Sequence, residues 1–375
     1  MADVQATLGL DVPEITVDVT DPAQVVRLAQ STDLVINAVG AYSTVGAGIW
    51  SACAFAGTDQ VDLCADIWWL AEAISLARDQ AASSGSRIVH SAGFLSLPFD
   101  LATLAVAEEM RSRFETPLQS VDFAIEVQPD STVLNITDVM SSGTMSSSLE
   151  VFRRGGDLVA RDVKMLDPNP HDALPYETSA RQHARTDQWL SPMMPTPYVN
   201  PTVVHRTASM HADTGLFDPS FRFRDGLVTT GAMPGVPDSM TAAWVAGAQF
   251  MGSMLGAAPE PMRNLMADSF EAFLPKSSGP SEQAMSGWNW ALRARAVGAS
   301  GDVIDLDVLG DGHLGYRSSA QLASETALWL LDEDIPAGVH TPGTAVGTAG
   351  IDRFRRAGME LRFDPERDPG SAATP

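Results

Sequence analysis

The stretch DLVINAVGAY, residues 33–42, decides the fold that we predict for this chain. Its apolar run from Leu34 to Val39, interrupted only by Asn37, is typical of a strand buried on both faces of a parallel sheet. The run leads into Gly40, and a helical segment begins near Gly46. A strand that ends in glycine and leads into a helix is how nucleotide-binding α/β folds meet their ligand.

The same alternation of strand and helix surrounds this stretch. We expect strands at 14–19, 33–39, 58–64 and 87–92, and helices at 21–31, 47–57, 67–85 and 97–114. Repeated β-α units at this spacing indicate right-handed crossovers and a parallel sheet. Residues 1–117 are therefore predicted to form a Rossmann-like nucleotide-binding domain.

After Pro117 the pattern changes from continuous apolar runs to alternating ones. We expect strands at 119–127, 205–212 and 220–231, a hairpin at 287–310, and helices at 140–156, 240–258, 259–273 and 318–333. Alternation predicts half-buried strands, as in an antiparallel sheet. The predicted organisation is an α+β substrate domain at 118–314, a helical segment at 315–364 that returns to the first domain, and a disordered tail at 365–375.

The charge of the chain excludes some classes of partner. Its 375 residues carry a net charge of −23, and Lys164 and Lys276 are its only lysines. A surface this acidic repels phosphate backbones, so nucleic-acid binding is not expected. The first ten residues lack the pattern of a signal peptide, and Cys53 and Cys64 lie in apolar surroundings. We therefore expect a cytoplasmic protein with reduced thiols.

Residues 240–258 form a run of 19 residues without a charged side chain. That length just reaches what a membrane-spanning helix needs. The run is rich in Ala and Gly, however, and contains Gln249. We expect a buried helix or one that lines an apolar tunnel, with membrane insertion or membrane-surface association as the alternative.

Five short stretches resemble the saccharopine dehydrogenase-like family, in particular its branch of trans-acting enoyl reductases. They are NAVGAY with Gly46 (37–46), ACAFAGTDQVDLCAD (52–66), IVHSAGFLSLPFDL (88–101), SSGTMSS (141–147), and GYRSSAQLASETALWLL followed by AGVHTPGTAVG (315–331 and 337–347). They occur in the order of the family's motifs and span most of the chain.

The resemblance implies an oxidoreductase that uses NADP, with NAD as the alternative, and reduces an activated C=C bond. The implied substrate is an acyl or lipid-like chain, which a synthase protein could carry. Family members begin with a strand, a glycine-rich turn and a helix, but here the only glycine before Gly40 is Gly9. We therefore expect a parallel sheet truncated at its N-terminal side. Either the start of the sequence is misplaced, or the chain is a reduced relative with impaired cofactor binding.

The cofactor-binding residues are assigned by this resemblance. Asp18 would approach the adenine, and the turn after residue 36 would lie on the nicotinamide side. The predicted set is Asp18, Asn37, Val39, Gly40, Ala41, Tyr42 and Gly46. Gly40 also has a physical reason, because bare backbone permits the close approach of a ligand. The alternative is that Gly40 simply ends a strand.

Two further turns are predicted to bind substrate, again by resemblance. Gly93 and Ser96 belong to the turn SAGFLSLPFD, in which Leu95 replaces an aspartate of the family. Ser142, Gly143 and Thr144 would offer free N–H groups at the start of a helix. For Ser96 and for the 141–144 stretch, ordinary helix capping is the alternative.

The predicted proton donors are Tyr42 and His90, by their position near the edge of the sheet. A Tyr-x-x-x-Lys donor is excluded, because no tyrosine is followed by lysine at that spacing. His90 could equally be a packed strand residue. We find no metal-ligand spacing, nucleophile elbow or phosphate loop. The rival to an enzyme is a non-catalytic relative that binds a partner protein or a lipid.

Overall fold

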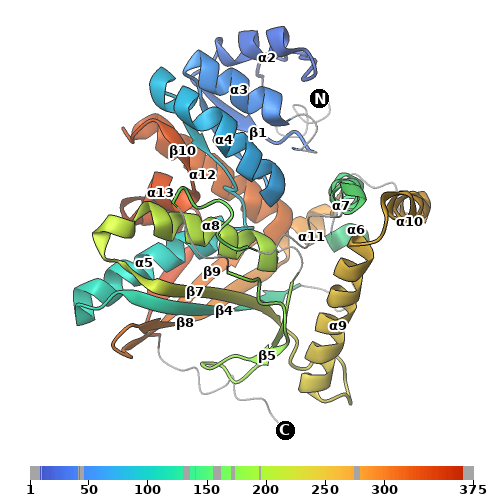
Figure 1. Cartoon of the computed structure of the whole chain (residues 1–375), viewed down its shortest axis with the longest axis vertical. Coiled ribbons are helices and arrows are strands. Elements are labelled where there is room, and N and C mark those ends of the chain that lie inside the picture. The colour runs from blue at the N-terminus through green and yellow to red at the C-terminus, as the bar shows by residue number, and fades with distance from the viewer. Residues whose placement is uncertain are drawn as a thin grey trace.

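The computed structural model describes residues 9, 11–40, 42, 46–129, 136–139, 141–154, 162–169, 174–193, 196–273 and 279–365. Within these ranges the chain forms two sheets. One is parallel and four-stranded, and the other is mixed and seven-stranded. The parallel sheet and its helices lie at one end of the molecule, and the larger sheet lies beneath them (Figure 1). The predicted α/β class is therefore confirmed.

The parallel sheet has the strand order β1-β2-β3-β10. Its strands are β1 (Leu34–Asn37), β2 (Asp59–Asp62), β3 (Arg87–Val89) and β10 (Gly338–His340). Every residue of β2 is buried, as expected of a central strand covered on both faces. β10 pairs in parallel with β3, so a strand from the last part of the chain completes this sheet.

Short-range signals determine where the helices of this region begin and end. The helices are α2 (Pro22–Ala29), α3 (Ala47–Ala56), α4 (Ile67–Ser84) and α5 (Leu97–Phe114). The Asp66 side chain accepts a hydrogen bond from the N–H of Trp69 and so caps α4. α4 ends at Gly85, whose φ of +88° is the left-handed conformation that glycine favours.

The larger sheet has the order β11-β9-β8-β4-β7-β6-β5. Its strands are β4 (Leu118–Gln128), β5 (Arg181–Gln182), β6 (Trp189–Ser191), β7 (Phe217–Val228), β8 (Asn289–Gly298), β9 (Val303–Asp311) and β11 (Glu360–Phe363). The pairing of β4 with β7 is parallel and the other pairs are antiparallel, so the sheet is mixed. α5 packs on this sheet through an aromatic cluster of Phe99, Phe123 and Phe223.

The remaining elements connect or flank the sheets. They are α6 (Ile136–Val139), α7 (Ser142–Arg154), α8 (Thr196–Met210), η2 (Ala212–Thr214), α9 (Asp238–Gly256), α10 (Glu260–Phe273), α11 (Glu282–Ser286), η3 (Leu314–Ser318), α12 (Ser319–Asp332), α13 (Pro342–Val346), η4 (Thr348–Gly350) and α14 (Ile351–Arg356). α9 extends along the side of the molecule and leads to α10, which lies beside α7 (Figure 1). Of the helices described, none combines the length and the apolar composition needed to cross a bilayer. The expectation of a buried helix at 240–258 is wrong, because Trp244 and Met251 of α9 are 68% and 65% exposed.

Two expected strands are wrong. Residues 14–19 form no strand, because a strand needs a neighbour and β1 pairs only with β2 in the part of the chain described. The Asp18 carboxylate instead accepts from Thr20 and turns the chain toward α2. Residues 205–212 were expected as a strand, but most of them belong to α8. The buried Val199, Val203 and Val204 follow a helical spacing that Pro201, inside the helix, obscures.

Candidate functional site

The carboxyl ends of the parallel strands form one edge of the sheet, which we call the carboxyl rim. It contains Asn37 at the end of β1, Asp62 at the end of β2, His90 after β3 and Thr341 after β10. All four side chains are buried. In open α/β sheets, ligands bind outside this edge. The structure therefore brings two predicted residues, Asn37 and His90, to one edge with two that the sequence did not single out.

Asp62 holds the rim together. Its carboxylate accepts hydrogen bonds from the Trp50 indole at 2.7 Å, the Gln60 amide at 3.1 Å, and the N–H groups of Cys64 at 2.9 Å and Ser91 at 3.1 Å. These donors come from α3, β2 and the segments after β2 and β3. Burial raises the pKa of Asp62 to about 6. The signal in the sequence was an acidic residue at the end of a fully buried strand.

The predicted donor Tyr42 bridges two strand ends. Its hydroxyl donates to the Asn37 carbonyl at 2.9 Å and accepts from the N–H of Leu63 at 3.2 Å. Burial, followed by the negative charge of Asp62, raises the pKa of Tyr42 far above its ordinary value. The phenol is thus held by backbone groups and remains protonated. It positions the segment after β1 whatever its role in chemistry.

Asn37 has one hydrogen-bonded and one unused side-chain atom. Its Oδ1 accepts from the N–H of Val39 at 3.1 Å, whereas its buried Nδ2 has no partner among the described residues. Val39 and Gly40, the next residues of the predicted site, are exposed. Ala41 lies outside the described residues. A buried donor beside exposed backbone is an arrangement that can meet a ligand oxygen.

Gly46 and Asp18 lie beside the start of α3. A Cβ added to Gly46 would stand 3.2 Å from atoms of Trp69 and Tyr42, so this glycine permits the close packing of the two rings. Asp18 is exposed, and its hydrogen bonds with Thr20 lower its pKa. The carbonyl of Val19 lies 3.7 Å from the Cβ position of Gly48 in α3. Asp18 is therefore next to the α3 start, without the strand that was expected to present it.

His90 is fully buried behind the rim. Its Nδ1 lies 3.1 Å from the Ser91 hydroxyl, which donates to the carbonyl of Cys64. Its Nε2 is buried and has no partner in the ranges that the structure describes. Burial, then the positive charges of Arg206 and His340, hold the pKa of His90 well below its usual value. The imidazole is neutral at physiological pH and presents one unused nitrogen.

The turn after β3 contains two strained residues. Ser91 has a φ of +56° and Ser96 a φ of +108°, and both are fully buried. Such backbone strain concentrates at functional sites, where the surrounding structure enforces it. The predicted residue Gly93 lies between them against α12. A Cβ at Gly93 would stand 2.9 Å from Leu63 Cδ2 and 3.1 Å from the Ser319 hydroxyl.

Ser96 does not cap α5 with its side chain, so the capping alternative for this residue is wrong. Its hydroxyl instead lies 3.5 Å from the Oδ1 atom of Asn200 on α8. Asn200 donates to Asp225 of β7 at 2.6 Å, and Thr196 donates to the same carboxylate at 3.3 Å. Burial raises the pKa of Asp225 to about 6. This buried network joins the turn after β3 to the larger sheet, and sequence reasoning missed it.

A second buried carboxylate joins α5 to the turn after β10. Asp100 accepts a hydrogen bond from the N–H of Gly343 at 2.7 Å. A Cβ added to Gly343 would stand 2.9 Å from the Asp100 carboxylate and 3.0 Å from Thr207. Burial raises the pKa of Asp100 to about 6. Thr341 and Thr344 form a capping box in the same turn, which explains part of the TPGTA motif.

The predicted residues at the start of α7 belong to a separate cluster. Ser141 caps this helix by accepting from the N–H of Thr144 at 3.1 Å. The hydroxyl of Thr144 lies 2.9 Å from that of Tyr316 in η3. Ser142 and Gly143 occupy the first turn of α7, and their side-chain surroundings lie outside the described residues. At Thr144 the geometry is that of the capping alternative.

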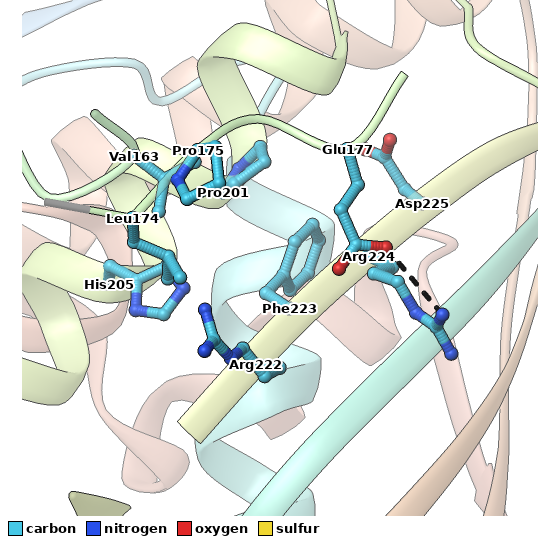
Figure 2. A pocket seen from close by; sticks show the side chains of 10 residues that line it. All are labelled: Val163, Leu174, Pro175, Glu177, Pro201, His205, Arg222, Phe223, Arg224 and Asp225. Carbon is cyan, nitrogen blue, oxygen red and sulfur yellow. Dashed lines mark ion pairs between the residues drawn. The ribbon is translucent and has the colours of Figure 1, made fainter. Parts of the chain in front are cut away.

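Two hollows among the described residues lie away from the carboxyl rim. The smaller has room for about 20 Å³, roughly one water molecule. Figure 2 shows it among residues from the 163–177 segment, α8 and β7, with the ion pair of Glu177 and Arg224 at one side and His205 and Arg222 at the other. The larger, of about 640 Å³, is open and lies at the amino ends of β2 and β3, beside Asp59 and Arg87. The carboxyl rim remains the stronger candidate, because it combines strain with buried unpaired nitrogens.

No metal centre is apparent in the part of the chain that the structure describes. No group of three or more His, Cys, Asp or Glu side chains is placed to hold a metal ion there. Cys53 and Cys64 are free and buried. Burial raises the pKa of the Cys53 thiol to about 12, and that of Cys64 is also raised. Both are thus packed thiols of low reactivity.

Comparisons with known proteins agree with the resemblance carried by the motifs. The chain is 28% identical over 369 residues to a protein of Mycobacterium tuberculosis named a candidate trans-acting enoyl reductase, covering 93% of this chain and 84% of that protein. It is 26% identical over 374 residues to the trans-acting enoyl reductase of Mycobacterium ulcerans, covering 95% and 86%. No protein-family model matches the chain.

A saccharopine dehydrogenase-like oxidoreductase of Rattus norvegicus is 31% identical over 167 residues, covering 44% of this chain and 37% of that protein. Among solved structures, the apo saccharopine dehydrogenase (L-Glu forming) of Saccharomyces cerevisiae aligns with a TM-score of 0.49 and 13% identity, covering 97% and 91% of the two chains. The resemblance to the saccharopine dehydrogenase-like family and its trans-acting enoyl reductase branch, expected from the motifs, is confirmed by the sequence relatives.

Proposed function

Because this chain is related over most of its length to proteins named trans-acting enoyl reductases, we propose that it is an oxidoreductase that acts at the carboxyl rim. The reaction would be reduction of an activated C=C bond in an acyl or lipid-like substrate. The observation that carries the proposal is the strained turn 91–96, held between the rim and α8 at the edge where α/β folds bind nucleotides.

A nicotinamide cofactor fits the residues at this rim. The buried Nδ2 of Asn37 and Nε2 of His90 lack partners among the described residues. Asn37 Nδ2 could donate to a carbonyl oxygen of the cofactor. In the neutral His90 ring Nδ1 carries the proton, since the Ser91 hydroxyl donates to Cys64, so Nε2 could accept from a carboxamide N–H. The exposed backbone at Val39 and Gly40 permits the close approach of a flat ring. Bound there, the cofactor would supply the hydride, while the protein would orient the substrate and exclude water.

We propose NADP rather than NAD, on the resemblance alone. Among residues 1–77 the only basic residue is Arg27, so the sequence does not single out a partner for the 2′-phosphate. The choice between the two cofactors therefore rests on a direct comparison of their binding. The domain division follows the same proposal: 1–117 would hold the nucleotide, 118–314 would cover the substrate, and 315–364 would return to the first domain.

The proposed substrate is an enoyl thioester, carried by a synthase protein acting as the partner. Support comes from the printed names of the relatives and from the apolar turn beside the rim. In that turn Phe94 is fully buried, and Leu95 is partly buried against the core. An apolar turn suits an alkyl chain better than it suits a polar amino acid.

A non-catalytic binding protein is the second candidate. The observation that favours it is that His90 is fully buried, and that the hydroxyl of the half-buried Tyr42 is already bonded to two backbone groups. A protein of this kind would bind acyl chains through the same rim without turning over a nicotinamide cofactor.

The experiment is a titration with NADPH and with NADH, followed by turnover of a trans-2-enoyl thioester. We expect Gly40→Val to abolish NADPH binding and leave the thermal unfolding curve unchanged, because the added side chain blocks the approach of the ring. Gly252→Val is the matched control, since a Cβ on this exposed glycine of α9 meets nothing within 4 Å. Unchanged binding by Gly40→Val would remove this turn from the site. Acyl binding without NADPH oxidation would favour the binding protein.

Tyr42→Phe and His90→Gln separate positioning from proton donation. Loss of a proton donor lowers kcat by about 100-fold or more, whereas a positioning role changes KM together with stability. If both variants keep the kcat of the wild type, neither side chain donates the proton.

A further inference from the structure

α9 presents an unfilled helix-pairing seam to the outside of the molecule. The residues Met240, Trp244, Gly247, Met251 and Met254 follow one another at spacings of four and three. An alternation of four and three is typical of a helix that packs along another helix. The large side chains of this seam are 61%, 68%, 65% and 57% exposed in chain order.

The opposite face of α9 holds it to the rest of the chain. Thr241, Ala242 and Gly256 are buried, and the amide of Gln249 donates to the carbonyl of Pro192 at 2.6 Å. The helix is thus anchored along the face that looks toward β6, and the seam looks away from it. Figure 1 shows α9 along one side of the molecule, where another helix could lie against it.

We propose that α9 pairs antiparallel with the α9 of a second copy of this chain, so that the protein is a two-fold symmetric dimer. The charge distribution favours this occupant. The chain has a net charge of −23, but residues 239–259 carry no ionisable side chain. Two equally acidic copies can meet closely only where neither presents charge. A bilayer-surface helix, in contrast, has a basic polar face, whereas α9 begins with Asp238 and is followed by Glu260 at the start of α10.

The shape of the seam is complementary to itself. Gly247 lies at its centre, and a Cβ added there would meet nothing within 4 Å, so two backbones can approach closely at this point. In an antiparallel pair centred on Gly247, Trp244 of each copy faces Met251 of the other. Each large exposed side chain of α9 offers on the order of 100 Å². Two seams together with Leu255 therefore bury roughly 1,000 Å², about the lower limit of a specific interface.

The test is sedimentation velocity of the full chain between submicromolar and 100 µM concentrations, without detergent. We expect a dimer for the wild type, and association weakened at least about 100-fold in Trp244→Glu, because each copy then brings a carboxylate to the seam. Leu76→Glu on α4 is the matched control, since Leu76 is also 68% exposed, and it should leave the dimer intact. A monomeric wild type, or a dimer that survives Trp244→Glu, would overturn the proposal.

Cross-linking tests the direction of pairing and does not depend on the stability of a charged variant. Both native cysteines are buried, so a single new cysteine reports on the seam. Ala248→Cys should form an intermolecular disulfide on mild oxidation. Met240→Cys, at the end of the seam, should not, because its copies would lie roughly 21 Å apart in the antiparallel pair. Cross-linking of both variants would indicate a parallel pair, and binding to neutral vesicles with no cross-link would indicate a lipid surface; either contradicts the proposal.

Discussion

The carboxyl rim buries polar side chains, whereas α9 exposes apolar ones. In most proteins polar side chains are exposed and apolar ones are buried, and both regions depart from this distribution. Such departures carry information about function. At the rim, Asp62 accepts hydrogen bonds from Trp50 on α3 and from the N–H groups of Cys64 and Ser91 after β2 and β3, so the polar groups fix the geometry of the turns. On α9 the large side chains of the seam point away from the rest of the chain. We propose that the first region holds a small ligand and that the second binds a second copy of the chain.

The same substitution in the two regions should change the free energy of unfolding by very different amounts. Trp50, which is 1% exposed and donates to Asp62, belongs to the rim, whereas Trp244 belongs to the seam of α9. We expect Trp50→Ala to lower the free energy of unfolding by about 3–5 kcal/mol, because it leaves a cavity and removes a buried hydrogen bond. Trp244→Ala should change it by less than about 0.5 kcal/mol.

Urea denaturation at submicromolar concentration, where the proposed dimer is dissociated, measures both tryptophan variants. A loss of several kcal/mol for Trp244→Ala under these conditions would mean that α9 is held within the chain more firmly than its exposure suggests.

Two glycines give the next largest contrast. Gly343→Ala should lower the free energy of unfolding by about 2 kcal/mol, because the new methyl would meet the Asp100 carboxylate at 2.9 Å. Gly252→Ala on α9 should raise it by about 0.5–1 kcal/mol, because alanine favours the helix and meets nothing there. Thermal unfolding followed by circular dichroism compares the two. If Gly343→Ala leaves the free energy of unfolding unchanged, the turn after β10 can relax around the new methyl group. The rim would then be less rigid than its contacts imply.

The smallest expected effect is a pH dependence at Asp100. Its pKa is raised from 3.8 to about 6 by burial, so its contribution to stability is fully present below pH 3.8 and is lost as pH rises through 6. Asp100→Asn removes this titration while an amide oxygen can still accept from Gly343. The variant should therefore gain about 1 kcal/mol relative to the wild type between pH 5 and pH 7.

The measurement is the difference in unfolding free energy between wild type and Asp100→Asn at the two pH values. Because the buried histidines titrate equally in both proteins, their effects cancel. A difference that does not change with pH would mean that the Asp100 carboxyl is already ionised at pH 5.

Local patterns predicted much of the secondary structure. The apolar run 34–39, interrupted only by Asn37, and the glycine that ends the helix at 67–85 are signals between residues close in sequence, and the corresponding elements are present. The two wrong strands have a shared cause. Whether residues 14–19 form a strand depends on a neighbouring strand, and whether 205–212 form one depends on the buried face of α8. Neither condition can be recognised from the residues of the segment alone.

The candidate site likewise has some features that local sequence predicts and others that only the tertiary structure reveals. The sequence by itself determined the α/β class and placed Asn37, Gly40 and His90 near one edge, because strand ends and turns are local features. Only the tertiary structure decided that Asp62 and Asp100 tie this edge together, and that Ser96 is strained toward Asn200 instead of capping a helix. The physical reason is that a buried polar group must find its partners wherever the fold brings them, and here the partners of Asp100 and Ser96 lie more than a hundred residues away in the chain.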